Sequence, residues 1–174
     1  VTFICPISTK GLDTALRLAG RRPDIPFVFV ESWPINEIRR VARDLQLRRH
    51  ANVILRKQTH DMRSIYREAR LILIPSPSFE GWGRVASEAQ VSGIPVLASN
   101  VGGLPEAVGP GGILIDPQAG IGSWVAALAR LWDDSAEYDR IARLALSHSR
   151  RKEFAKEKLA ERLVAVITDL LVVT

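Results

Sequence analysis

The sequence has very little of the chemistry that disulfides and metal sites require. It contains a single cysteine, Cys5, and three scattered histidines, His50, His60 and His148. One cysteine excludes an internal disulfide, and the three histidines offer no metal-ligand spacing. We therefore expect no metal site, a structural or surface role for these four residues, and a reducing, cytoplasmic setting.

Long apolar runs and dinucleotide or triphosphate fingerprints are missing too. No segment reaches the roughly 18 apolar residues that a membrane span needs, and no signal-peptide pattern is present. Neither Gly-x-Gly-x-x-Gly nor Gly-x-x-x-x-Gly-Lys-Ser/Thr follows the first predicted strand, which argues against an NAD enzyme and an NTPase. Because the chain opens at Val1 inside that strand, we expect it to be a piece of a longer protein.

The charge of the chain is basic, and the excess lies at its front. Lys and Arg number 24 against 19 Asp and Glu, a net charge of +5. Residues 1–57 hold eleven of the basic and five of the acidic residues, whereas residues 80–120 hold one and four. Aromatic interleaving and long basic runs are lacking, so no nucleic-acid partner is expected. The basic surface suits a bound diphosphate, or peripheral contact with the anionic inner face of a membrane.

Apolar segments without polar alternation indicate strands that are buried on both faces of a parallel sheet. Helical apolar spacing occurs between them, at residues 12–19, 38–45 and 85–89, and each such helix is expected to be a crossover. This alternation predicts an α/β fold with a doubly wound, six-stranded, Rossmann-like parallel sheet in a single domain, residues 1–174. The predicted strands are residues 2–5, 27–31, 52–55, 71–74, 96–99 and 113–115.

The C-terminal part, residues 120–174, is predicted to be helical. Two helices are expected at 120–132 and 136–146, and a last helix of about twenty residues from Glu153. In that last helix residues 163–167 and 170–173 are apolar nearly all round, which is costly in water. Either this surface packs into the domain's own core, or a partner domain outside this chain covers it.

In a doubly wound sheet the ligand lies beyond the carboxyl ends of the strands where the strand order reverses. This rule selects the loops at residues 6–11 and 75–83. Lys10 stands at the start of a helix, where its charge would oppose the dipole unless an anion binds there. Gly81 and Gly83 let backbone approach a ligand and lead into a helix that starts near Arg84, a seat suited to a diphosphate.

Two carboxylates bracket that glycine turn. Glu80 lies just before the helix, and Glu88 lies within it on a face with apolar neighbours, where a carboxylate is expensive unless it accepts hydrogen bonds. Gly102 and Gly103 form a further turn at the same predicted edge of the sheet. Loops that converge in this way favour a binding site over packing alone.

These residues resemble the family 4 retaining glycosyltransferases, specifically the C-terminal half of their two-domain GT-B fold. That family carries Glu-x7-Glu with a Gly-x-Gly turn behind the first Glu, as in Glu80 to Glu88. The resemblance covers most of residues 1–132. It continues through the segments Glu88-Ala89, Gly93-Ile94-Pro95-Val96, Ser99, Gly102-Gly103-x-Pro105-Glu106 and Lys10-Gly11.

The resemblance implies a donor site for a nucleotide-diphosphate sugar, UDP- or GDP-linked, without a metal cofactor. Glu80 would contact hydroxyls of the sugar, Lys10 the diphosphate and Glu88 the ribose, so Glu80 and Lys10 are the candidate catalytic residues. Retention implies front-face attack, in which the leaving diphosphate takes the acceptor's proton. The remaining candidate donor-binding residues are Gly81, Trp82, Gly83, Arg84, Val85, Gly102, Gly103 and, near the nucleobase, Arg56.

The sequence departs from the family at two places. Cys5 stands where many members have an Arg that holds the diphosphate, and Arg84 is a candidate substitute. The N-terminal domain, which binds the acceptor glycan or lipid, is absent from these residues, so the piece should bind donor and transfer nothing. Two other interpretations stay open: half of a non-hydrolysing sugar-nucleotide epimerase, and a stand-alone nucleotide-binding module.

Overall fold

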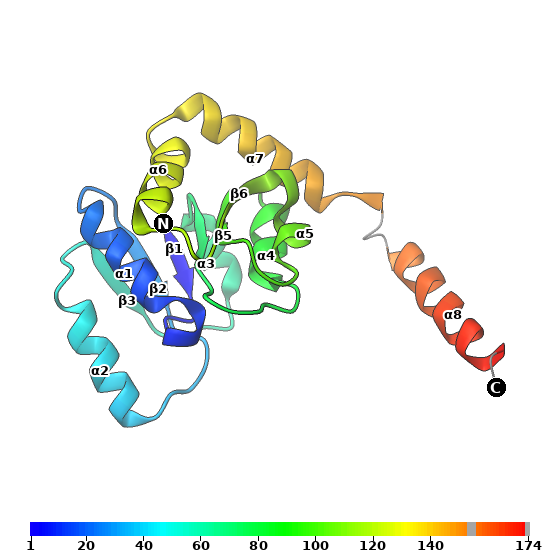
Figure 1. The fold of residues 1–174 in the computed structure, drawn as a ribbon, viewed down its shortest axis with the longest axis horizontal. Coiled ribbons are helices and arrows are strands. Elements are labelled where there is room, and N and C mark those ends of the chain that lie inside the picture. The colour runs from blue at the N-terminus through cyan, green and yellow to red at the C-terminus, as the bar shows by residue number, and fades with distance from the viewer. Residues whose placement is uncertain (153–155, 173–174) are drawn as a thin grey trace.

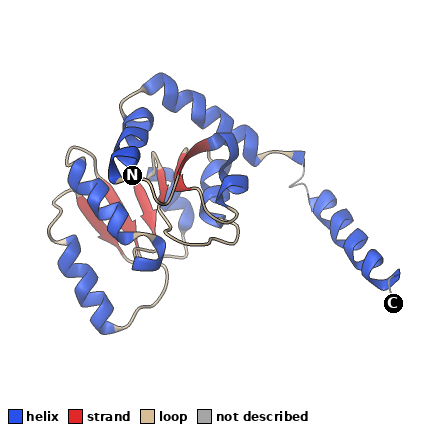
Figure 2. Ribbon diagram, viewed as in Figure 1, coloured by secondary structure: helices blue, strands red, loops and turns tan. Residues whose placement is uncertain are grey.

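A six-stranded sheet lies between helices on both of its faces (Figures 1 and 2). The computed structural model describes residues 1–152 and 156–172. All strands are parallel, and their order is β3-β2-β1-β4-β5-β6. The doubly wound Rossmann-like prediction is confirmed, with the reversal of strand order between β1 and β4. The strands are β1 (Thr2–Ile4), β2 (Phe27–Val30), β3 (Val53–Arg56), β4 (Ile72–Ile74), β5 (Val96–Ser99) and β6 (Gly112–Ile115).

The helices connect these strands and then continue beyond β6. The 3-10 helix η1 (Ser8–Lys10) precedes the first α-helix, and the 3-10 helix η2 (Gly109–Gly111) precedes β6. The α-helices are α1 (Leu12–Arg21), α2 (Glu37–Leu47), α3 (Met62–Glu68), α4 (Arg84–Val91), α5 (Leu104–Val108), α6 (Ile121–Trp132), α7 (Ser135–Ser149) and α8 (Lys156–Val172).

Each face of the sheet has its own apolar core. On one face Phe3 and Phe29 of the sheet pack with residues of α1 and α6. On the other face Ile72 and Ile74 pack with residues of α3, α4 and α5. Strand side chains alternate between faces, so the uninterrupted apolar strands supply both cores at once.

The predicted strands agree with the observed ones to within one residue at each end. Cys5 was expected to close the first strand, but its backbone is left-handed, with φ of 66°, so β1 ends at Ile4. A non-glycine residue in this region ends regular strand geometry. Helix α3 was not predicted, because its apolar residues are too few to show a clear period.

The orientation of α2 differs from expectation. Its predicted core-facing residues Ile38, Val41 and Leu45 are 81%, 49% and 55% exposed, so their expected packing against the sheet is wrong. Arg43 and Leu47 face the domain instead, at 5% and 6% exposure. The Arg43 guanidinium lies 2.6 Å from Oε1 of Glu31, and this ion pair orients the helix together with the packing of Leu47 in the core.

Helix α8 projects away from the rest of the chain (Figure 1). Its apolar side chains, among them Leu163, Val164 and Leu170, are 61%, 62% and 67% exposed, so for the described residues burial in the domain's own core is wrong. The expected start of this helix, Glu153, and its expected end, Val173, lie outside the described residues. Within the described part of the chain, no helix is long and apolar enough to cross a membrane.

Candidate functional site

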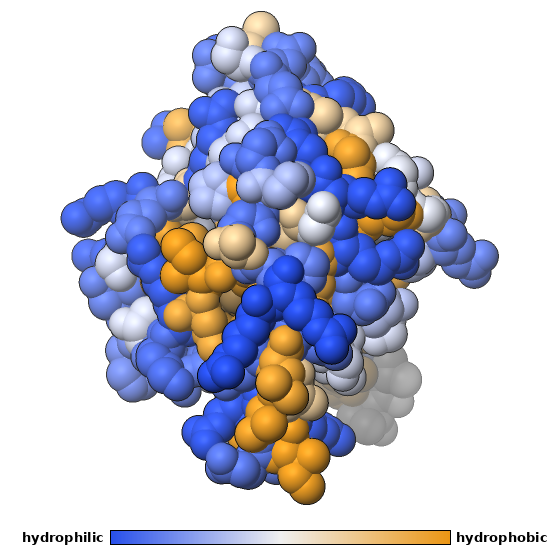
Figure 3. All heavy atoms as spheres, turned by 90° about the vertical axis from the view of Figure 1, so that its left-hand side faces the viewer, coloured by the Kyte–Doolittle hydropathy of each residue, from blue (hydrophilic) through white to orange (hydrophobic). Residues whose placement is uncertain are grey.

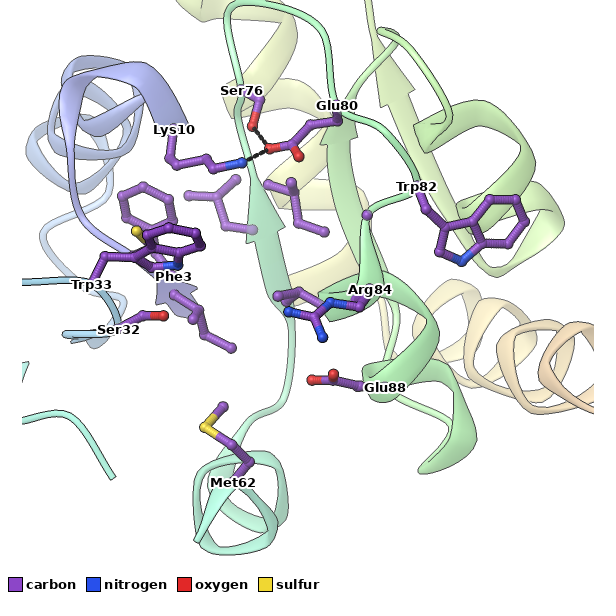
Figure 4. Close-up of a pocket in the computed structure, with 16 residues that line it drawn as sticks. Phe3, Lys10, Ser32, Trp33, Met62, Ser76, Glu80, Trp82, Arg84 and Glu88 are labelled. Carbon is purple, nitrogen blue, oxygen red and sulfur yellow. Dashed lines mark hydrogen bonds and ion pairs between the residues drawn. The ribbon is translucent and has the colours of Figure 1, made fainter. Parts of the chain in front are cut away.

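A pocket of about 560 Å³ opens at the carboxyl ends of β1 and β4, where the strand order reverses (Figure 4). Its wall comes from both halves of the sheet and from the loops and helices that follow β1, β2, β3 and β4. The lining residues that carry the argument are Cys5, Lys10, Trp33, Glu80, Arg84 and Glu88. The pocket lies where the sequence predicted a ligand crevice.

Lys10 and Glu80 meet at one end of the pocket. The Lys10 ammonium donates to Oε1 of Glu80 at 2.5 Å, and the Ser76 hydroxyl donates to the same oxygen at 2.6 Å. The two loops approach closely because Gly11, with φ of 87°, has no Cβ, and a Cβ there would lie 1.9 Å from the Pro75 carbonyl oxygen. An ammonium has three donors, so Lys10 can hold Glu80 and still offer hydrogen bonds to an anion.

Glu88 lies at the other end of the pocket, on α4 (Figure 4). Its carboxylate is exposed, which corrects the expectation of an apolar environment, since Ala86 and Ala89 of the same helix turn toward the core instead. Tyr66 of α3 donates its hydroxyl to Oε2 of Glu88 at 2.6 Å. Burial, and then this hydrogen bond, raise the pKa of Tyr66 far above its usual value. The phenol therefore stays a neutral donor that fixes one carboxylate oxygen and leaves the other open.

Two further groups set the charge between these ends. Arg84, the first residue of α4, is exposed in the pocket wall and forms no ion pair among the residues that the structure describes. Cys5 is buried in the wall, and burial raises the pKa of its thiol. Lys10 and Arg84 are thus the two cations of the pocket lining, with the carboxylates Glu80 and Glu88 beside them.

Some predicted residues do not line the pocket. Arg56 pairs with Glu68 of α3 at 2.5 Å, outside the lining. The Trp82 indole points away from the pocket (Figure 4) and donates to the Ser87 hydroxyl at 3.0 Å, although Trp82, Gly83 and Val85 are part of the wall.

The Gly102-Gly103 turn lies behind Glu80 rather than in the pocket. The Gly103 amide donates to the Glu80 carbonyl at 2.8 Å, and a Cβ on Gly102 would lie 2.1 Å from that carbonyl oxygen. A Cβ on Gly103 would lie 2.2 Å from the Gly81 carbonyl oxygen, and Gly81 itself does not line the pocket. The turn gives backbone support to the Glu80 loop, and the expected contact between the turn and a ligand stays a prediction.

Several residues of the pocket wall are not predicted from the sequence. Ser32 and Trp33 follow β2, and Met62 begins α3. Trp33 is 69% exposed, which is unusual for so large an apolar side chain. Its position directly after a buried strand is a sequence feature that could have indicated a site residue. Tyr66 lies on α3, a helix that the sequence pattern does not predict. Across the described residues, no group of three or more His, Cys, Asp or Glu could hold a metal ion.

Comparison with known proteins agrees with this fold. HepE of Anabaena, solved in complex with UDP-glucose, superposes with a TM-score of 0.82 at 19% identity, over 97% of this chain and 48% of that one. The C-terminal domain of a glycosyl transferase group 1 family protein from Francisella tularensis gives a TM-score of 0.73 at 22% identity, over 87% and 84%. At such identities the similarity establishes the fold alone, and that fold is the one found in one half of GT-B enzymes.

Sequence comparison gives the family. The chain is 32% identical to a D-inositol 3-phosphate glycosyltransferase of Corynebacterium urealyticum over 172 residues, which are 91% of this chain and 39% of the relative. It is 42% identical to a protein of the same name in Thermobispora bispora over 114 residues, 61% of this chain and 24% of the relative. The chain thus spans well under half the length of these relatives. The model of the family "Glycosyl transferases group 1" matches residues 7–148, and the chain belongs to that family.

Proposed function

We propose that this chain is the donor-binding half of a retaining, family 4 glycosyltransferase that uses a UDP- or GDP-linked sugar. The observation that carries the proposal is the pocket in which Lys10 and Glu80 meet at one end and Glu88 lies at the other. The family membership favours a transferase over the epimerase and over a stand-alone nucleotide-binding module.

The two ends of the pocket match the two ends of a nucleotide sugar. Glu88 would accept hydrogen bonds from the ribose diol through the oxygen that Tyr66 leaves open. Glu80 would accept from hydroxyls of the sugar, and charge-assisted bonds of this kind are short and strong. Between them Lys10 and Arg84 would supply the positive charge that a diphosphate needs, with Arg84 in place of the arginine that Cys5 replaces.

Helix α4 offers a further seat for the phosphates. Its N-cap Gly83 has no side-chain cap, so the first backbone amides of the helix remain available to an anion. The backbone of Gly81 to Val85 would therefore contact the sugar and the diphosphate. Gly102 and Gly103 would act indirectly, by holding the Glu80 carbonyl.

In the transfer itself, the bond between the sugar's anomeric carbon and the diphosphate oxygen breaks, and the acceptor hydroxyl attacks from the same face. The acceptor's proton passes to the leaving diphosphate, so no protein nucleophile is needed. Catalysis is then positioning together with stabilisation of the leaving charge by Lys10 and Arg84. The acceptor, a glycan or a lipid, would be bound by the N-terminal half of the longer protein.

The experiment that tests this proposal uses the longer protein with a panel of UDP- and GDP-sugars. Release of nucleoside diphosphate that depends on an added acceptor would support transfer, and NMR of the new linkage should show the anomeric configuration of the donor. An inverted product would contradict the retaining mechanism, and interconversion of the free sugar nucleotide would instead indicate the epimerase. This chain alone should bind the donor and release no product.

A further inference from the structure

Helix α2 presents an apolar face to solvent. Ile38, Val41 and Leu45 are spaced three and four residues apart and so lie on one side of the helix. Figure 3 views the molecule from the side on which Figure 1 places α2, and shows an apolar stripe at the surface in its lower part. We call these three residues the α2 apolar face. They are 81%, 49% and 55% exposed. Single exposed apolar residues are normal on a protein surface, but three on one helix face form a patch that calls for an explanation.

This outward orientation is fixed by the opposite side of the helix. Arg43 is 5% exposed, and its guanidinium bonds Glu31 at the end of β2 at 2.6 Å and Asp44 at 2.8 Å. Leu47, 6% exposed, joins the core between the sheet and α1. Turning the apolar face inward would expose Leu47 and break a buried ion pair, which is strongly destabilising.

The charge around the α2 apolar face is positive. Arg48 and Arg49, which directly follow the last residue of α2, are exposed and form no ion pair with any residue that the structure describes. Both acidic residues of the helix form ion pairs with arginines of the same helix, Glu37 with Arg40 and Asp44 with Arg43. Contact with solvent alone does not explain an apolar helix face flanked by unpaired arginines.

We propose that α2 docks on an anionic lipid bilayer, with Ile38, Val41 and Leu45 in the headgroup region and Arg48 and Arg49 on the lipid phosphates. A basic amphipathic helix binds membranes by the sum of buried apolar area and attraction to anionic lipid. Arginine suits this rim because its aliphatic stem can lie along the apolar layer while the guanidinium reaches the phosphates.

This inference does not rest on the proposed function, because the α2 apolar face shares no residue with the pocket wall.

The test is co-sedimentation of the whole chain with vesicles of phosphatidylcholine alone and of two parts phosphatidylcholine to one part phosphatidylglycerol. The variants are Ile38→Ser with Val41→Ser and Leu45→Ser, and separately Arg48→Gln with Arg49→Gln. Val91→Ser, at a 65% exposed position on α4, is the matched apolar control. A triple variant of α8, Leu163→Ser with Ile167→Ser and Leu170→Ser, separates any binding by that helix.

The parent should bind the anionic vesicles, and binding should weaken as salt rises. The apolar α2 variant should lose at least about tenfold in partition constant. The double arginine variant should lose about 25-fold, which is about fivefold for each basic residue near an anionic surface. The Val91 control and the α8 variant should keep the preference for anionic lipid. The substituted side chains are exposed, so thermal unfolding should change little. Three results would each overturn the proposal: no binding by the parent, equal binding by parent and α2 variants, or a parent dimer that the α2 substitutions convert to monomer.

Discussion

The Tyr66 hydroxyl donates to Oε2 of Glu88 at 2.6 Å and joins α3 to α4 across the rim of the pocket. Tyr66 is 8% exposed, so its hydroxyl has few alternatives to this acceptor. The bond restricts the rotamers of an otherwise exposed glutamate and leaves one of its oxygens free for a ligand. On the proposed function, Tyr66 would therefore position Glu88 at the nucleoside end of the site.

Tyr66→Phe should weaken nucleotide binding by about 0.5–1.5 kcal/mol, the usual net value of one hydrogen bond. The loss should be the same for a nucleoside diphosphate and for its sugar conjugate, because both contain the ribose that we propose Glu88 binds. Isothermal titration calorimetry measures both. Tyr138→Phe on α7, whose ring lies 4.1 Å from the Arg70 guanidinium, is the matched control and should leave both affinities unchanged. Unchanged affinity in the Tyr66 variant would show that Tyr66 does not position Glu88 for ligand binding.

The fold was predictable because its signals are local, while parts of the site were not. Uninterrupted apolar strands and glycine turns predicted the sheet, the crevice and the Lys10, Glu80 and Glu88 positions from spacing alone. The rotation of α2 depends on the burial of Leu47 and on an ion pair between Arg43 and Glu31, and an apolar period cannot reveal that pair. The role of Gly102 likewise depends on a close approach between loops that lie 22 residues apart in the chain.

Gly102→Ala should destabilise the domain and weaken binding of the sugar conjugate. With φ of 54°, an alanine there costs about 1–2 kcal/mol in backbone strain, before any displacement of the Glu80 carbonyl by its Cβ. Denaturant unfolding gives the loss of stability, and calorimetry gives the loss of affinity. Gly122→Ala, in α6 and with nothing near its added Cβ, should instead stabilise by about 0.5–1 kcal/mol. Equal behaviour of the two variants would contradict the close-packing account.

Cys5 should react slowly with iodoacetamide at neutral pH, and nucleotide should protect it. Burial raises its thiol pKa, with Lys10 opposing in part, so the reactive thiolate is scarce until the pH exceeds the usual thiol pKa of about 8.5. The alkylation rate should therefore still be rising with pH near that value and above. Mass spectrometry is unambiguous because the chain has one cysteine. Rapid labelling at neutral pH, indifferent to bound nucleoside diphosphate, would show that Cys5 does not line an occupied site.

The chain should self-associate through α8. Its exposed apolar residues Leu163, Ile167 and Leu170 have no cover in the domain, and on our account they pack on the missing half of the longer protein. Sedimentation velocity should show association that weakens on truncation after Glu161 or on substitution of the three residues by serine. Val91→Ser should have no such effect. A monomeric parent that unfolds upon truncation would mean that α8 belongs to the core of this domain.

The central claim assigns the two ends of the pocket to two parts of one ligand, and the two glutamates separate them. We would titrate the domain with UDP, GDP, ADP and their sugar conjugates, first as the parent and then as Glu88→Ala, Glu88→Gln and Glu80→Ala. Both Glu88 variants should weaken a diphosphate and its conjugate alike, the alanine by about 1.5–3 kcal/mol. The glutamine keeps an acceptor for Tyr66 and so controls for disturbance of α3.

Glu80→Ala should weaken the conjugate alone. Glu161→Ala on α8 should change neither, and Lys10→Ala should weaken both, less so at high salt. If the parent binds but Glu88→Ala leaves the affinity untouched, or if Glu80→Ala weakens the free diphosphate as much as the conjugate, the assignment of the pocket is contradicted.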